Sequence, residues 1–238
     1  MRYNISAILD FLKELKYNNS LEWMHAHQKE YHFARDEFNR MGDYIIRQMQ
    51  FFDPTLQHQD IKTASYRLAR DTRFSMNKQP YHTHFGFYLN RFGKQCWGGG
   101  YLLYFQPDDE DGDYGPLSQI CAGLYKPTCA IQKAVREAIY YDEEHTLQRI
   151  LDSDAFHRSG MKFIDSEMFK RPQKDYQDYP YPQLVQSKMW LLQQDVHEKE
   201  LLDENFPERV IETFRACKPW NDFINEALED SGVKLIWK

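Results

Sequence analysis

"HFGFYLNRFGKQCWGGGYLLYFQ", residues 84–106, decides the fold class. It holds two aromatic runs, at 84–92 and 100–106, on either side of a glycine-rich turn that ends at Gly100. Aromatic and branched apolar residues favour strands, and glycines between such runs favour a turn. No helix and no lysine follow the glycines, so they are not a phosphate-binding loop. The segment predicts two strands, and short turns between neighbouring strands are typical of an antiparallel sheet.

Helical periodicity precedes this segment. Apolar residues recur at helical spacing over 5–15, and again in steps of three and four over 23–52. Asn19 and Glu22 have the spacing of a capping box, and Pro54 marks the end of the second helix. The first quarter of the chain is therefore predicted to be helical.

Further strands and helices are predicted on both sides of the central pair. Alternation over 61–73 predicts a strand, and SQICAGLY at 118–125 predicts another. Helical spacing returns over 128–151 and from Pro207 onward, where Pro219 predicts a kink or a break. Helices first, strands in the middle and helices last indicate an α+β fold, with a single antiparallel sheet packed against N- and C-terminal helices.

Composition restricts the class of protein. The 238 residues are 42% hydrophobic, which suffices for one large domain or two small ones, and the sequence shows no repeat and no clear linker. We therefore expect a single domain over 1–238. The net charge of −6 disfavours general nucleic-acid binding. No apolar run approaches the roughly 18 residues of a membrane span, and the N-terminus lacks the features of a signal peptide. The four cysteines are scattered without a CxxC pair. We expect a cytoplasmic protein that does not bind membranes.

The most charged stretch, RLARDTRFSMNKQPYHTHFG at 67–86, directly precedes the central strands. In an extended chain Arg67, Asp71 and Arg73 point to one side and Arg70 to the other. Lys78 adds a further positive charge from the following turn. Guanidinium groups match the geometry of phosphate and carboxylate, so the stretch is a candidate anion site. A semi-buried ion network that only stabilises the fold is the structural alternative.

A second basic group lies in the proline-containing loop FKRPQKDYQDYPYP at 169–182, with Lys170 and Arg171 followed by tyrosines. Aromatic rings beside cations can stack on bases or sugars, although a polar loop that packs its tyrosines on the domain explains the pattern as well. If this loop folds over the arginine stretch, the two basic groups form one pocket. Tyr81 or the loop would then close that pocket.

Metal binding and nucleophilic catalysis lack the required residues. His82 and His84 are spaced to share one face of a strand, but the only further ligand nearby is Asp71, for which arginines compete. The sequence contains no nucleophile elbow, P-loop, dinucleotide or zinc-protease motif. We therefore expect neither a metal nor a cofactor.

The charged stretch resembles the signature of an uncharacterised bacterial and fungal family, domain of unknown function 2461. The matching positions are Arg67, Arg70, Asp71, Thr72, Arg73, Phe74, Ser75, Lys78, Pro80, Tyr81, Phe85 and Gly86. The N-terminal segment, AGLYKP and the proline-containing loop also resemble the family, so the likeness covers nearly the whole chain. In that loop Tyr179 stands where the family usually has histidine. The resemblance implies no activity.

Three hypotheses about function remain open. The first is the binding of an anionic small molecule by the arginine stretch, with Arg67, Arg70, Arg73 and Lys78 as ligands and Asp71 orienting the arginines. The second is a hydrolase that acts on a phosphorylated small molecule. The third is a partner-binding protein in which the charged motif is purely structural. The sequence does not determine the oligomeric state.

Overall fold

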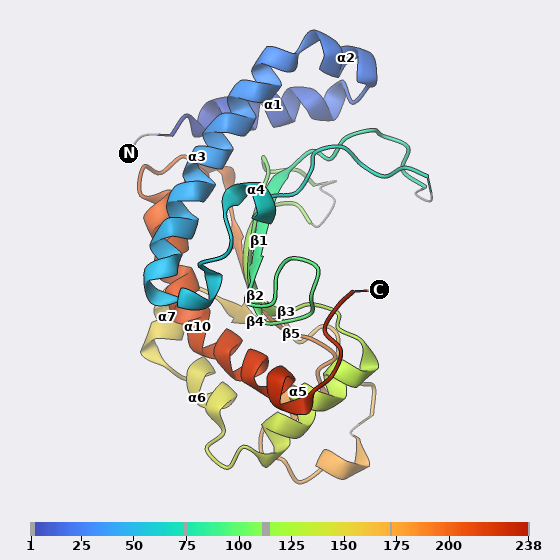
Figure 1. Cartoon of the computed structure of the whole chain (residues 1–238), viewed down its shortest axis with the longest axis vertical. Coiled ribbons are helices and arrows are strands. Elements are labelled where there is room, and N and C mark those ends of the chain that lie inside the picture. The colour runs from blue at the N-terminus through green and yellow to red at the C-terminus, as the bar shows by residue number, and fades with distance from the viewer. Residues whose placement is uncertain (1–2, 74–75, 111–114, 172, 238) are drawn as a thin grey trace. The chain divides into compact units, whose positions relative to one another are not determined.

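The computed structural model describes residues 3–73, 76–110, 115–171 and 173–237 (Figure 1). The chain forms two compact units, each assembled from three segments. Unit 1 comprises Met1–Tyr88, Leu102–Ile120 and Asp195–Ile211, and unit 2 comprises Leu89–Tyr101, Cys121–Gln194 and Glu212–Lys238.

The predicted α+β class is confirmed, with one five-stranded antiparallel sheet. Its strands are β1 (Phe85–Asn90), β2 (Gly100–Phe105), β3 (Ser118–Leu124), β4 (Lys162–Phe163) and β5 (Trp190–Val196). Their order is β1-β2-β3-β5-β4, and β4 pairs antiparallel with β5. β1, β2 and β3 lie where the aromatic and apolar runs predicted them. β4 and β5 were not predicted from the sequence.

Helices precede and follow the strands along the chain. The helices before β1 are α1 (Ile5–Tyr17), α2 (Leu21–Ala26), α3 (Gln28–Phe52), the 3-10 helix η1 (Pro54–Leu56) and α4 (Ile61–Ala64). The later ones are α5 (Cys129–Tyr141), α6 (Thr146–Leu151), α7 (Asp154–Ser159), the 3-10 helix η2 (Lys174–Tyr176), α8 (Pro182–Gln186), α9 (Glu198–Leu201) and α10 (Phe206–Ser231).

In unit 1 the apolar face of α3 packs on the sheet, and α1 packs on α3. Phe38 of α3 is fully buried and its ring lies 5.3 Å from that of Phe85 and 5.8 Å from that of Phe105. A ring of this size contributes much of the apolar area that stabilises a core. The predicted long helix is divided in two at His27. This residue is the C-cap of α2, which ends at Ala26, and α3 begins at Gln28.

Two local predictions in unit 1 are wrong for the same reason, a side chain that caps a helix. Ile61–Ala64 is helical rather than extended, because Asp60 accepts a hydrogen bond from the Thr63 amide at 2.8 Å and Thr63 reciprocates. This capping box closes one helical turn. The N-cap of α2 is Ser20, whose hydroxyl accepts from the Trp23 amide, and not Asn19.

In unit 2 the turn that ends at Gly100 lies against α10. Asn225 accepts from the Gly99 amide at 2.8 Å and donates to its carbonyl oxygen at 3.0 Å. A Cβ atom at Gly99 would lie 3.0 Å from the Asn221 backbone, so the close approach requires glycine. α10 continues through Pro219, and the predicted break does not occur there. The flanking Cys217 and Trp220 are fully buried, which anchors the helix on both sides of the proline.

The described helices include none that is both long enough and apolar enough to cross a membrane.

Candidate functional site

The charged stretch forms an arm, residues 65–84, of which 74 and 75 lie outside the described residues. Figure 1 shows it extending away from α4 and from the start of β1. Its two sides are joined by backbone hydrogen bonds from Tyr66 to Gly86 at 2.9 Å, from His82 to Leu68 at 2.8 Å and from Arg70 to Pro80 at 2.9 Å. Isolated antiparallel bridges join Ser65 to Phe87 and Ala69 to Tyr81. The arm is thus a narrow hairpin rather than part of the predicted strand.

Side chains alternate along the first side of the arm, as the sequence predicted. Arg67, Asp71 and Arg73 are exposed, whereas Arg70 is half-buried and Leu68 is buried. The alternation of an extended chain explains this pattern even though the segment is not a regular strand. The charged side chains of Arg67, Asp71 and Arg73 are therefore all exposed to solvent.

Arg73 and Asp71 form a bidentate ion pair that is exposed to solvent. Nε and Nη2 of Arg73 donate to Oδ1 and Oδ2 of Asp71 at 2.9 and 2.6 Å, and the two side chains are 77% and 58% exposed. Hydrogen bonds from Arg73 lower the pKa of Asp71 to about 2. The pair is therefore not the semi-buried network that the structural alternative required.

Two polar residues outside the charged motif hold the base of the arm. Arg35 on α3 donates through Nη2 to the Ser65 hydroxyl at 2.7 Å and to the Tyr66 carbonyl at 2.9 Å. Asn19 donates to the Tyr81 carbonyl at 2.9 Å and accepts from the Tyr81 amide at 3.1 Å. Neither role was predicted from the sequence, in which Asn19 has the spacing of a helix cap and Arg35 belongs to no motif.

Arg35 has an unusual environment for a cation. Its guanidinium lies 5.1 Å from the ring centre of Phe85, and burial lowers its pKa. Its buried Nη1 has no hydrogen-bond partner among the described residues. Neutral carbonyl and aromatic partners therefore compensate its charge only in part.

The remaining predicted site residues are distributed over both units. In unit 1, Lys78 is exposed and donates to the Thr72 carbonyl at 3.0 Å, and Tyr81 is half-buried. In unit 2, Lys170 and Arg171 are exposed in the loop before η2. The closure of this loop over the arm remains a prediction.

His82 and His84 lie close together, with ring centres 4.9 Å apart. His84 is buried and its ring also contacts that of Tyr104, at 4.3 Å. A search of the described residues finds no group of three or more histidine, cysteine, aspartate or glutamate side chains placed to hold a metal ion. His84 is thus a buried residue at the end of the arm that packs against Tyr104.

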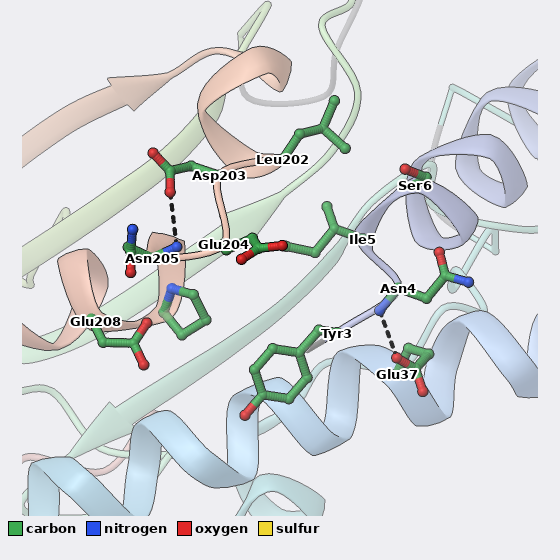
Figure 2. A pocket seen from close by; sticks show the side chains of 11 residues that line it. Tyr3, Asn4, Ile5, Ser6, Glu37, Leu202, Asp203, Glu204, Asn205 and Glu208 are labelled. Carbon is green, nitrogen blue, oxygen red and sulfur yellow. Dashed lines mark hydrogen bonds between the residues drawn. The ribbon is translucent and has the colours of Figure 1, made fainter. Parts of the chain in front are cut away.

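Unit 1 also contains a pocket of about 830 Å³ that the sequence analysis did not anticipate. It is lined by Tyr3, Asn4, Ile5, Ser6, Glu37, Leu202, Asp203, Glu204, Asn205, Pro207 and Glu208 (Figure 2). Four of these eleven residues are acidic and none is basic. The lining comes from three separate stretches of the chain, so no local motif could have revealed it.

Comparison with known proteins gives a family and no activity. The family described as "Conserved hypothetical protein (DUF2461)" matches residues 7–223. No curated protein and no solved structure matches the chain. The match covers most of both compact units and the whole arm. The chain therefore belongs to the DUF2461 family of conserved hypothetical proteins.

Proposed function

We propose that the arm binds an anionic small molecule that carries phosphate or carboxylate groups. The observation that supports this proposal is the exposure of Arg67, Arg73 and Lys78 on one short hairpin. Residues 65–84 contain four Lys and Arg residues and one acidic residue, within a chain of net charge −6. Such a local excess of positive charge attracts anions despite the negative charge of the whole protein.

The chemistry of the arm suits the oxygen atoms of a carboxylate or phosphate group. Guanidinium groups present paired N–H donors that match carboxylate and phosphate oxygens. Asp71 engages Nε and Nη2 of Arg73 and so fixes the plane of its guanidinium. In this proposal Arg67 and Lys78 supply further donors, Arg70 contributes positive charge from the half-buried side, and Tyr81 lies beside the ligand.

Calorimetric titration with citrate, pyrophosphate and ATP tests the proposal. We expect Arg67→Ala and Arg73→Ala each to weaken binding of the best ligand by about 5–20-fold, the range typical of charge-assisted hydrogen bonds at a solvated site. The control is Arg47→Ala, which removes an equally exposed arginine that pairs with Asp43 on α3. Binding that Arg47→Ala weakens as much as Arg73→Ala would show a response to net charge alone and contradict the proposal.

The contribution of Lys170 and Arg171, in the unit 2 loop before η2, is tested separately. We propose that Lys170 and Arg171 contact the same ligand, because they are exposed cations beside tyrosines. The double variant Lys170→Ala/Arg171→Ala should then weaken binding by about 5-fold or more. Affinity equal to that of the wild type would restrict the site to the arm.

A further inference from the structure

The arm already holds a carboxylate of its own against the arginine that its proposed ligand would contact. Nε and Nη2 of Arg73 donate to the two oxygens of Asp71 at 2.9 and 2.6 Å, and the Arg73 amide donates to Oδ1 at 3.2 Å. Paired N–H donors that face two oxygens are the arrangement by which arginine binds carboxylates and phosphates. The Asp71 side chain thus makes the contacts expected of a bound anion.

The short separation of the two residues favours this contact over one with a dissolved anion. Asp71 and Arg73 are two positions apart, so the carboxylate stays near the guanidinium at a high effective concentration. Hydrogen bonds from Arg73 lower the pKa of Asp71 to about 2, so the carboxylate is ionised at every physiological pH. A dissolved anion therefore meets an arginine whose Nε and Nη2 are already engaged.

The contact has effects of opposite sign on a ligand. It fixes the plane of the guanidinium, which favours binding, but it also occupies two donors and places a negative charge beside an incoming anion. Both side chains lie in solvent, at 77% and 58% exposed. An exposed ion pair contributes at most about fivefold to an equilibrium, so a ligand can displace the Asp71 carboxylate at moderate cost.

A second cation lies close to the pair. Lys78 donates from Nζ to the carbonyl oxygen of Thr72, the residue between Asp71 and Arg73, at 3.0 Å. An anion with two charged groups can therefore contact Lys78 in addition to the donors that it takes over from Asp71. This additional contact offsets the cost of the displacement.

We propose that Asp71 is an internal competitor of the ligand, because its carboxylate occupies the Arg73 donors that an anion uses, and that an anion binds by displacing it. The inference rests on the proposed anion site of the arm and concerns the regulation of that site. The orienting effect of Asp71 is then smaller than its blocking effect.

Calorimetric titration of citrate into Asp71→Asn at about 0.15 M salt tests the proposal. Asparagine keeps an oxygen that accepts from Arg73 but has no charge and is a weaker acceptor. We expect citrate to bind Asp71→Asn about 5–10-fold tighter than the wild type. In an Arg73→Ala background the same substitution should tighten binding only about 2–3-fold, because it then removes repulsion alone.

Asp43→Asn is the matched control for net charge. Asp43 pairs with Arg47 on α3 at 2.9 Å, so this substitution also releases an exposed arginine, at a distance from the arm in the sequence. It should leave citrate affinity within about 1.5-fold of the wild type. Asp71→Ala, which removes the acceptor as well as the charge, is a second variant that should still bind citrate tighter than the wild type.

Three results would overturn the inference. Weaker citrate binding by both Asp71 variants would leave the anion site intact and make Asp71 an orienting residue. Equal gains from Asp71→Asn with and without Arg73, or equal gains from Asp71→Asn and Asp43→Asn, would show an effect of charge alone. Absence of citrate binding to both the wild type and Asp71→Asn would overturn the anion site itself, and this inference with it. Melting temperatures of all variants identify folding defects.

Discussion

Two arginines connected with the arm differ in their surroundings, and this difference separates a stabilising residue from a candidate ligand. Arg73 is exposed and pairs with the equally exposed Asp71, so water competes for both charges. Arg35 is half-buried, packs on Phe85 and donates to two oxygens at the base of the arm. Arg35 thus supports the base of the arm, whereas the ion pair of Arg73 and Asp71 lies in solvent.

This contrast predicts opposite effects on stability. Arg73→Ala should leave the melting temperature within about 2 °C of the wild type, because exposed substitutions rarely change stability much. Arg35→Ala should lower the free energy of unfolding by about 2–3 kcal/mol, because it removes charged hydrogen bonds and ring packing. For a chain of this size the melting temperature should fall by roughly 4–12 °C. Differential scanning calorimetry checks both, and a large drop in Arg73→Ala would show that the pair stabilises the fold.

Asp71 gives a prediction about pH. Its carboxyl has a pKa of about 2 in the folded protein, against an ordinary value of 3.8, so folding favours the ionised form. The contribution of the pair to stability is therefore present above about pH 4 and is lost as the pH falls towards 2. An NMR titration of the Asp71 carboxyl measures this pKa, and a midpoint near 4 would contradict the ion pair.

At the scale of elements, the arm is a hairpin that side chains outside it, Asn19 and Arg35, help to hold in place. The Asn19 side chain binds both the amide and the carbonyl of Tyr81, which continues the hydrogen-bond pattern of the returning side. Leu68 supplies a buried apolar anchor. Loss of a contact that holds a protruding hairpin should increase local opening of that hairpin.

Asn19→Ala should therefore loosen the arm without unfolding the protein. We expect faster amide exchange and faster proteolysis within residues 76–84, with a loss of stability of about 1–2 kcal/mol. Asn18→Ala is a matched control, since the Asn18 side chain donates only to the Glu14 carbonyl at the end of α1. Exchange rates that rise equally in both variants would show that the Tyr81 contacts do not hold the arm. Hydrogen exchange read by mass spectrometry distinguishes these outcomes.

At the scale of the whole molecule, charge is unevenly distributed. The chain carries −6 in total, while the arm has an excess of positive charge and the pocket of unit 1 is lined by four acidic residues. At about 0.01 M salt the Debye length is roughly 30 Å, so a ligand senses most of the protein. At about 0.1 M it is roughly 10 Å, and a ligand senses mainly its own site.

Salt should therefore affect anion binding by the arm in two opposing ways. Local attraction and the negative charge of the whole protein oppose each other, so affinity should change little between 10 and 100 mM salt and fall above that. Titrations of citrate over this range check the prediction. A steep fall in affinity from 10 mM onward would contradict it.

The sequence by itself determined the features that depend on neighbouring residues. Helical periodicity located α1, α3, α5 and α10, and the aromatic runs located β1 and β2. The same local logic predicted that Arg67, Asp71 and Arg73 point to one side of an extended chain, and the structure shows all three exposed. These predictions hold because the spacing of side chains along a helix or an extended chain is a property of the backbone itself.

Only the tertiary structure decided which distant groups meet. Asn19 could cap a helix or bind a distant backbone, and the choice depends on Tyr81 lying beside it. The acidic pocket likewise combines residues 3–6, 37 and 202–208, which no local pattern connects. The physical reason is that long-range contacts form only where packing compensates the entropy of closing the chain. The family motif could thus be recognised from the sequence alone. The contacts that hold the arm and the residues that line the pocket of unit 1 are brought together only by the tertiary structure.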